Sequence, residues 1–248
     1  MSWSAAQYLK FEEERTRPVR DLVARIPKHE VQRAADIGCG PGNSTQILHE
    51  RWPEALIVGL DSSADMIEAA RRRLPGISFE VADISNWRDV GFDVILANAV
   101  IHWIPGHDAL LPRLMGQLGP SGSLARRAQL HRLMREIAAA GPWASKLAGA
   151  ENARELPRGA DWYFRLLRAH ASRVDIWRTT YFHPLAGARA VVEWVKGTAL
   201  RPFLDPLDPV ERADYLTAYE QAIAEAHSAE ADGTVLLPFP RLFFVATR

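Results

Sequence analysis

Three glycines alternate with other residues in the segment Asp36-Ile37-Gly38-Cys39-Gly40-Pro41-Gly42, directly after an apolar run. Because glycine has no Cβ, such a segment lets the backbone turn sharply and lets a ligand lie against main-chain atoms. Two further acids, Asp61 and Asp83, each end a later apolar run. If these runs are parallel strands, the acids lie at strand carboxyl ends, where open α/β sheets bind ligands. The segment and the acids therefore predict a ligand site.

Two classes of nucleotide-containing cofactor use a glycine loop of this kind. Dinucleotide enzymes require G-x-G-x-x-G, whereas this chain has G-x-G-x-G with Asn43 after Gly42. Asp36 would repel a pyrophosphate, but it can pair with the ammonium group of an amino-acid moiety. Asp61 is placed to accept hydrogen bonds from ribose hydroxyls. These features favour S-adenosylmethionine (SAM) as the cofactor.

The apolar runs alternate with segments of helical spacing, which is typical of a parallel α/β sheet with right-handed crossovers. Strands are expected at 31–37, 55–60, 77–81 and 92–97. Asn43 or Ser44 is expected to cap the helix after the glycine loop, and a second helix covers 62–74. Upstream, helical spacing covers 4–26, with Pro18 starting a second helix.

The C-terminal half is less regular. Helices are expected at 130–140, 162–171, 188–200 and 209–226, and strands at 174–182 and 234–247, the last broken by Pro238 and Pro240. We expect a single domain over 1–248. Its core covers about 30–125 plus the strands near 174–183 and 241–247, and helical cap segments cover 1–29, 130–171 and 186–230.

Composition excludes several classes of protein. The chain has 248 residues, 48% of them hydrophobic, so it can bury a substantial core. Thirty basic residues balance thirty acidic ones, which argues against a nucleic-acid or membrane-surface partner. The single cysteine, Cys39, cannot form an internal disulfide, so a cytoplasmic location is expected. No signal peptide, membrane span or metal-ligand spacing is visible. A monomer is the expected state.

The strand–Asp-x-Gly-x-Gly-x-Gly pattern, followed by Asp61 and Asp83-Ile84, resembles the class I SAM-dependent methyltransferases over about residues 30–125. The resemblance implies a Rossmann-like, mostly parallel sheet with a late antiparallel strand and helical cap insertions. In that family the glycine loop cradles methionine and ribose, an acid like Asp61 holds the ribose, and one like Asp83 meets the adenine amino group. The expected cofactor-binding residues are Asp36, Gly38, Cys39, Gly40, Gly42, Asp61, Ser62, Met66, Asp83, Ile84 and Asn98.

A narrower resemblance covers nearly the whole chain. The blocks that carry it are Trp3, Tyr8, Phe11, Arg15, Arg17-Pro18, Asp21-Leu22, Asn98-Ala99-Val100-Ile101-His102-Trp103, Val191-Val192-Glu193-Trp194-Val195-Lys196-Gly197-Thr198 and Leu200-Arg201-Pro202-Phe203. They resemble the trans-aconitate 2-methyltransferase family. The resemblance implies transfer of the SAM methyl group to a carboxylate of trans-aconitate, giving a monomethyl ester and S-adenosylhomocysteine.

A tricarboxylate acceptor has clear chemical requirements. A carboxylate with a pKa of about 4 is already a nucleophile at pH 7, so no general base is needed. The substrate must be desolvated and held by cations, for which arginine forks are best suited. The candidate substrate-binding residues are Tyr8, His102, Trp103, Arg178, Tyr181 and Arg201, with Lys196 as a further cation. Trp3 and Tyr8 are either a lid over the cofactor or apolar anchors.

Rival functions remain open. Methyltransferases that act on adenine or glutamine amino groups carry Asn-Pro-Pro-aromatic after strand four, where this chain has Asn98-Ala99-Val100-Ile101. Another small-molecule O-methyltransferase is the nearest rival, and His102 is the candidate base if the acceptor is a hydroxyl. A non-catalytic SAM-binding protein and a nicotinamide oxidoreductase are more distant alternatives.

One stretch departs from the family pattern. The expected fifth strand, ending near Ala125, is followed at once by Arg126 and Arg127. Two arginines in a buried parallel strand are costly unless they are paired. This predicts that a segment is missing between about Ala125 and Leu133, so that no continuous strand passes through the two arginines.

Overall fold

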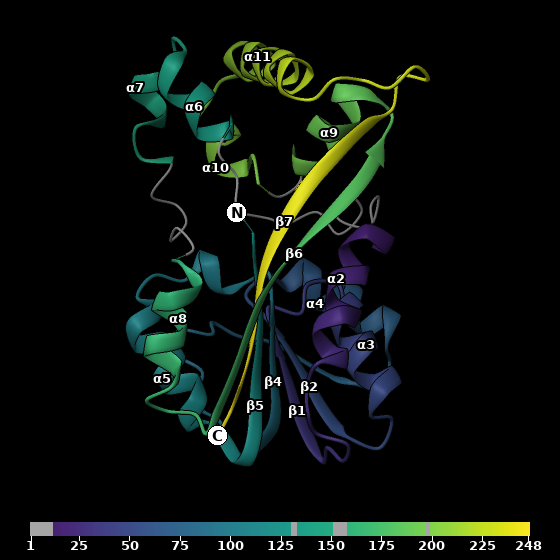
Figure 1. Ribbon diagram of the computed structural model, residues 1–248, viewed down its shortest axis with the longest axis vertical. Coiled ribbons are helices and arrows are strands. Elements are labelled where there is room, and N and C mark those ends of the chain that lie inside the picture. Colours follow the sequence, from purple (N-terminus) through teal and green to yellow (C-terminus); the bar gives the residue numbers. More distant parts are fainter. Residues whose placement is uncertain (1–11, 130–132, 151–157, 197–198) are drawn as a thin grey trace. The chain divides into compact units, whose positions relative to one another are not determined.

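The computed structural model describes residues 12–129, 133–150, 158–196 and 199–248 (Figure 1). Its seven-stranded sheet has the order β3-β2-β1-β4-β5-β7-β6. The strands in this order are β3 (Ser78–Val81), β2 (Leu56–Asp61), β1 (Arg33–Ile37), β4 (Phe92–Asn98), β5 (Leu118–Gln129), β7 (Val235–Thr247) and β6 (Arg173–Leu185). Neighbours from β3 to β5 pair in parallel, and β5 pairs antiparallel with β7. The predicted fold, a mostly parallel sheet with a late antiparallel strand, is confirmed.

The chain divides into two compact units. Among the described residues, the first unit holds 12–129, 158–179 and 241–248, and the second holds 133–150, 180–196 and 199–240. Strands β6 and β7 each pass from one unit into the other. The organisation of the whole chain as a single domain stays a prediction.

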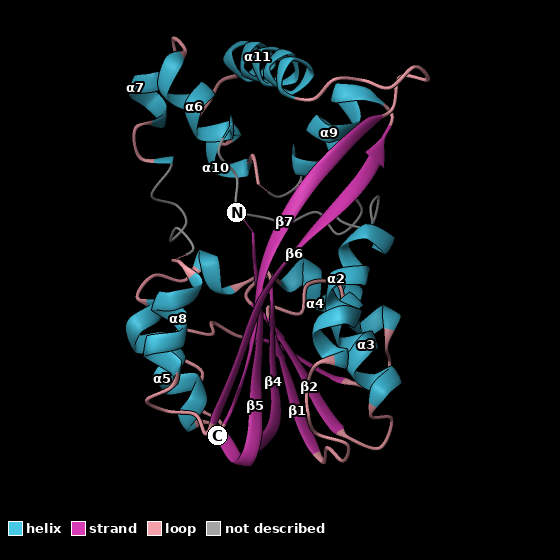
Figure 2. Cartoon of the chain, viewed as in Figure 1, coloured by secondary structure: helices cyan, strands magenta, loops and turns pink. Residues whose placement is uncertain are grey.

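Helices cover both faces of the sheet in the first unit (Figure 2). One face carries α2 (Glu12–Ala24), α3 (Asn43–Arg51) and α4 (Ala64–Arg73), and the other carries α5 (His107–Gly116) and α8 (Ala160–Leu167). Strand β4 is apolar throughout its centre because helices bury it from both sides, as parallel strands require. A short 3₁₀ helix, η1 (Ile101–Trp103), follows β4.

The second unit is mainly helical. It contains α6 (Leu133–Ala140), α7 (Ala144–Leu147), α9 (Gly187–Lys196), α10 (Arg201–Leu204) and α11 (Pro209–Ala226). Asp208 and Glu211 form a capping box at the start of α11. The buried Tyr215 of α11 donates a hydrogen bond from Oη to the Met134 carbonyl, 2.8 Å away, and so ties α11 to α6. A cavity of about 330 Å³ between α6, α9, α11 and β7 has a mostly apolar lining.

Two expectations about proline were wrong. Helix α2 continues through Pro18, which is buried with Val19, Leu22 and Val23, so packing outweighs the one lost backbone hydrogen bond. Residues 4–11 of the expected helical segment lie outside the described residues. Strand β7 is likewise unbroken at Pro238 and Pro240, which precede its paired stretch with β5, Arg241 to Thr247. Proline is tolerated in a strand where its nitrogen is not needed in the ladder.

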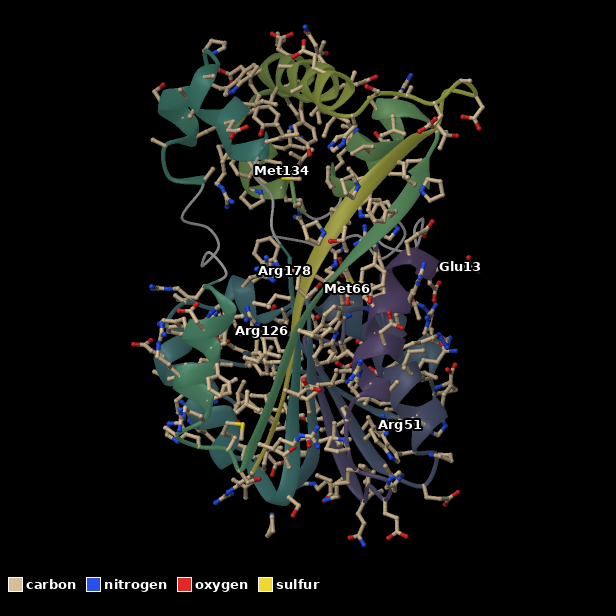
Figure 3. The ribbon with its side chains drawn as sticks, viewed as in Figure 1. Glu13, Arg51, Met66, Arg126, Met134 and Arg178 are labelled. Atoms are coloured by element: carbon tan, nitrogen blue, oxygen red, sulfur yellow. The ribbon has the colours of Figure 1, made fainter. Side chains whose placement is uncertain are left out.

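The expected break at the two arginines was also wrong. Strand β5 is continuous to Gln129, and Arg126 pairs in register with Ala97 on one side and Phe244 on the other. The Arg126 side chain, labelled in Figure 3, is only 1% exposed. Its Cζ lies 4.5 Å from the ring centroid of Tyr163 and 5.9 Å from that of Phe244. An arginine can therefore be accommodated within this buried strand, which contradicts the argument for a missing segment.

Candidate active site

The glycine loop begins where β1 ends. The backbone N–H groups of Gly38 and Cys39 both donate to the Leu60 carbonyl, at 2.7 and 2.9 Å, which ties the loop to β2. Gly40 has a φ of +56°, and a Cβ added there would meet no atom within 4 Å. The loop therefore presents backbone beside open space, as a surface for a ligand must. Gly42, rather than the expected Asn43 or Ser44, is the N-cap of α3.

Asp36 lies beneath this loop and is completely buried. Its Oδ2 accepts hydrogen bonds from the hydroxyls of Ser44 and Thr45, both at 2.7 Å. Its Oδ1 is buried and has no hydrogen-bond partner among the described residues. Burial raises the pKa of Asp36 to about 6, although the two hydroxyls oppose the shift. Ionised Asp36 is therefore destabilised by burial, and its Oδ1 can still accept a hydrogen bond from a ligand.

Asp61, at the end of β2, supports the same loop. Its Oδ2 accepts from the Gly40 N–H at 3.0 Å, and its Oδ1 accepts from the Ser63 N–H at 2.9 Å. Burial raises the pKa of Asp61, whereas the backbone N–H groups lower it. Both carboxylate oxygens have further lone pairs, so the group can hold the loop and still accept hydrogen bonds from a ligand.

The other expected cofactor residues differ in exposure. Asp83 is exposed, and its Oδ1 accepts from the Ser85 N–H at 2.8 Å. Ser62 is also exposed. Met66, Ile84 and Asn98 are buried, and Oδ1 of Asn98 has no hydrogen-bond partner among the described residues. All of these residues belong to the first unit, at or just beyond the carboxyl ends of β2, β3 and β4.

Cys39 is a packing residue. Its side chain is 3% exposed and belongs to an apolar cluster with Ile67, Ala70 and Phe79. Burial, followed by the charges of Asp36 and Asp61, raises the pKa of the Cys39 thiol far above its usual range. A thiol in this environment is a poor nucleophile. Within the described part of the chain, no group of three His, Cys, Asp or Glu side chains could hold a metal ion.

His102 and Trp103 lie in η1, directly after β4, in the same unit as the glycine loop. His102 is 8% exposed, and its ring centroid is 5.2 Å from that of Trp103. Ala99, between β4 and η1, has a φ of +56°, a conformation that is strained for alanine. The candidate site thus has a strained turn after β4 in addition to the glycine loop.

The remaining substrate candidates are distributed over both units. Arg178, on β6, belongs to the first unit and is exposed (Figure 3). Tyr181 and Arg201 belong to the second unit, where Tyr181 is buried and Arg201 lies 3.9 Å from the Asp205 carboxylate. Lys196 is 3.2 Å from Glu193. Tyr8 and Trp3 lie outside the described residues.

Sequence reasoning missed three buried side chains beside this site: His107, Tyr163 and Arg126. Each is at most 1% exposed, and Tyr163 contacts both of the others. Tyr163 lies on α8, far along the chain from the loop. The position of His107 at the start of α5 could have drawn attention to it. No local sequence pattern, however, pairs His107 with Tyr163.

Comparisons with known proteins identify the family. The family described as "Methyltransferase domain" matches residues 34–122. A trans-aconitate 2-methyltransferase from Methylobacterium nodulans is 53% identical over 253 residues, covering 99% of this chain and 98% of the relative. The chain belongs to the trans-aconitate 2-methyltransferase family.

Other members of the trans-aconitate 2-methyltransferase family also match this chain over nearly its full length. The relative from Rhodopseudomonas palustris BisB18 is 53% identical over 99% of both chains. The relative from Variovorax paradoxus is 46% identical over 256 positions, covering all of this chain and 99% of its own length. That match is longer than the 248 residues of this chain, so the relative has residues without a counterpart here.

Solved structures support the fold. The YcgJ protein from Bacillus subtilis superposes with a TM-score of 0.61 over 95% of this chain and 98% of its own, at 12% identity. Phosphoethanolamine N-methyltransferase 2 from Haemonchus contortus, solved with SAM, gives 0.58 over 94% of this chain and 52% of its own, at 16% identity. Among the described residues, no helix is long and apolar enough to cross a membrane.

Proposed function

We propose that this protein transfers the methyl group of SAM to a carboxylate of trans-aconitate and releases the monomethyl ester and S-adenosylhomocysteine. The observation that carries the proposal is the 53% identity, over almost the full length, to relatives named for this reaction. A cytoplasmic, monomeric enzyme without nucleic-acid partners is the setting we expect for it.

The glycine loop and its two acids suit SAM. The space beside Gly40 is open to a ligand, and a side chain there would narrow it. Oδ1 of Asp36 and Oδ1 of Asn98 are buried acceptors without partners among the described residues, and a ligand with ammonium and amino groups would satisfy such atoms. We assign Asp36 to the amino-acid part of SAM, Asp61 to the ribose and Asp83-Ile84 to the adenine. Gly38, the backbone of Cys39, Gly42, Ser62 and Met66 complete the proposed wall of the site.

Bound SAM supplies a methyl group already activated on a sulfonium centre. In the transfer, a carboxylate oxygen forms the new O–CH₃ bond, the S–CH₃ bond breaks, and its electron pair stays on sulfur. The acceptor is already ionised at neutral pH, so the protein needs to hold it in line and exclude water. His102 and Trp103, at the carboxyl end of β4, are assigned to the acceptor side. Because the acceptor carboxylate is already ionised, His102 is not required as a general base in this reaction.

The charge of the acceptor calls for a cation, and Arg178 is the strongest candidate. Its side chain is exposed, and no hydrogen bond or ion pair joins it to any other part of the described chain. Arg201 and Lys196 already lie near Asp205 and Glu193, respectively. We therefore assign Arg178 to a substrate carboxylate. Tyr8, Tyr181 and Arg201 stay separate candidates for binding the acceptor.

The direct test is methyl transfer from labelled SAM to a panel of trans-aconitate, cis-aconitate, citrate and isocitrate, measured as base-labile methyl ester. Turnover greatest with trans-aconitate supports the proposal. Tight SAM binding without ester from any acid would reject the acceptor but keep the cofactor. The same assay with hydroxyl-bearing acceptors then tests the nearest rival, an O-methyltransferase in which the buried His102 is the base.

A further inference from the structure

The turn after β4 is held from several directions within the first unit. Its backbone passes through the left-handed Ala99 and continues into η1, where the Trp103 N–H donates to the Val100 carbonyl at 2.9 Å. The Ile104 N–H then donates to the Ile101 carbonyl at 3.0 Å. The same turn carries His102 and Trp103, the candidate acceptor-side residues. Its exact shape therefore matters for the proposed reaction.

A buried histidine also bonds the Ile101 carbonyl. His107, the first residue of α5, has an exposure of 0%. Its Nε2 lies 2.9 Å from the Ile101 carbonyl oxygen, and its Nδ1 lies 3.2 Å from the Tyr163 hydroxyl. Because a carbonyl can only accept, Nε2 carries the proton. In the neutral ring Nδ1 then accepts the hydrogen bond from the Tyr163 hydroxyl.

Tyr163 is itself fixed by the sheet. It is fully buried on α8, with the Arg126 guanidinium 4.5 Å from its ring centroid and the Phe244 ring centroid at 5.8 Å. Strands β5 and β7 thus set the position of the tyrosine ring. A chain of contacts runs from the sheet through Tyr163 and His107 to the backbone of η1.

Tyr163 belongs to an apolar cluster that includes Ile101, Leu110, Leu111 and Phe244, and His107 is hydrogen-bonded to two members of this cluster, Tyr163 and Ile101. A buried hydroxyl and a buried imidazole cost free energy unless they are hydrogen-bonded, and here they bond each other while the imidazole also bonds the Ile101 carbonyl. Apolar packing alone also lets a short turn shift or rotate, whereas two directed hydrogen bonds define one orientation. The directionality of these two hydrogen bonds indicates a positioning role.

We propose that His107 and Tyr163 are positioning residues for methyl transfer. They hold the Ile101 carbonyl, and through it the His102–Trp103 turn, in the arrangement that the acceptor requires. This inference rests on the proposed function. Neither residue touches the reacting atoms in this assignment; both act through η1.

Tyr163→Phe is the sharpest test because it removes only the hydroxyl and keeps the ring beneath Arg126. The matched control is Tyr215→Phe, which removes another buried hydroxyl, the one bonded to the Met134 carbonyl in the second unit. We expect kcat for trans-aconitate to fall by about tenfold or more in Tyr163→Phe, as misplaced reacting groups predict, with KM for SAM unchanged. Tyr215→Phe should retain the wild-type kcat.

The conservative variant at the histidine separates positioning from packing. His107→Gln keeps an N–H donor within reach of the Ile101 carbonyl, so it should retain a larger share of kcat than His107→Leu. Equal loss of kcat in the two tyrosine variants, or wild-type kcat in Tyr163→Phe, would overturn the proposal. So would a parallel rise in KM for SAM, which would indicate general loosening.

A second measurement tests the positioning role without relying on methyl transfer to trans-aconitate. If the wild-type protein methylates none of the acids, amide hydrogen exchange still reports on the turn. Tyr163→Phe should then speed exchange at Trp103 and Ile104 and leave Val94 to Leu96 of β4 unchanged, whereas Tyr215→Phe should change neither. Unchanged exchange at Trp103 and Ile104 would reject the positioning role itself.

Discussion

Gly38 and Val100 lie so close together that no side-chain carbon fits between them: a Cβ added to Gly38 would overlap Cβ and Cγ2 of Val100. The glycine loop after β1 is therefore packed directly against the turn after β4. This contact joins the proposed cofactor-binding loop to the proposed acceptor-side turn. A substitution that shifts the backbone of the loop is therefore expected to shift the turn as well.

Gly38→Ala should disrupt both folding and SAM binding. The new Cβ meets Val100, and the residue has a φ of +71°, which costs a non-glycine residue about 1–2 kcal/mol before any clash. We expect a clear fall in melting temperature together with loss of measurable SAM binding by calorimetry.

Gly40→Ala is the matched comparison, because Gly40 has a similar φ of +56° but open space around its Cβ position. Its melting temperature should fall less than that of Gly38→Ala, while its SAM affinity still drops because the methyl group occupies the space assigned to the ligand. Equal stability losses in both variants would show that the Val100 contact is unimportant. Undiminished SAM affinity in Gly40→Ala would place the ligand elsewhere.

SAM affinity should increase with pH below neutrality. Burial raises the pKa of Asp36 from 3.8 to about 6 in the free protein, whereas pairing with the ammonium group of SAM favours the ionised form. Binding must then release a proton below pH 6, so the affinity should rise by about tenfold from pH 5 to pH 7. Titration calorimetry at several pH values measures this dependence.

Asp36→Asn provides the control, since the amide keeps the shape but does not titrate. Its SAM affinity should be weaker and nearly independent of pH over the same range. In the absence of SAM the raised pKa means that the folded state holds its proton more tightly than the unfolded state. Stability is therefore lost as pH rises through the interval from 3.8 to about 6, relative to Asp36→Asn, by on the order of 2 kcal/mol between pH 4 and pH 7. If the free energy of unfolding of the wild type instead rose with pH relative to that of Asp36→Asn, the burial of an ionisable Asp36 would be contradicted.

The places of the candidate cofactor residues in the fold could be predicted from the sequence because they depend on local patterns. Asp36, Asp61 and Asp83 each follow an apolar run, and the parallel topology brings strand carboxyl ends to one edge of the sheet. The alternation of strands and helices likewise predicts the fold. Such inferences depend on periodicity and on rules of connection, which a sequence displays directly.

The buried polar contacts could not be predicted because they join distant segments. The sequence predicts a high cost for Arg126 in a central strand, whereas in the structure the rings of Tyr163 and Phe244 lie beside its guanidinium. Those rings come from α8 and β7, and no local pattern pairs them with β5. Ser44 shows that even a contact between residues close in sequence can be missed. The sequence makes it a candidate helix cap, but its hydroxyl donates to Asp36 in the preceding strand, β1.

Asp61→Asn should weaken SAM binding by acting on two contacts. The carboxylate accepts from the Gly40 N–H at 3.0 Å and is assigned to the ribose hydroxyls. Each charge-assisted hydrogen bond contributes about 1.5–3 kcal/mol, so loss of the charge should weaken binding by at least about tenfold. The ribose assignment is checked with S-adenosylhomocysteine and its 2′-deoxyribose analogue. The wild-type protein should prefer the hydroxylated form more strongly than Asp61→Asn does, and an identical preference would reject the assignment.

Arg178→Met should raise KM for trans-aconitate without changing the dissociation constant of SAM. Arg178 is exposed on β6 and has no hydrogen bond or ion pair within the described residues, so its full charge is available to a substrate carboxylate. Loss of one such contact corresponds to about 1.5–3 kcal/mol, or about 10- to 150-fold in kcat/KM. Arg178→Lys should recover part of this loss, because a lysine keeps the charge but not the planar fork.

Arg201→Met is the matched comparison for Arg178. The Arg201 guanidinium is already 3.9 Å from the Asp205 carboxylate, which offsets part of its charge toward any other anion. We therefore expect a smaller rise in KM for trans-aconitate than in Arg178→Met, and the ranking should hold at every ionic strength. Because screening weakens attraction between exposed charges, added salt should reduce the difference between wild type and Arg178→Met. A larger effect at Arg201, or no effect at Arg178, would move the principal carboxylate contact from β6 to the start of α10.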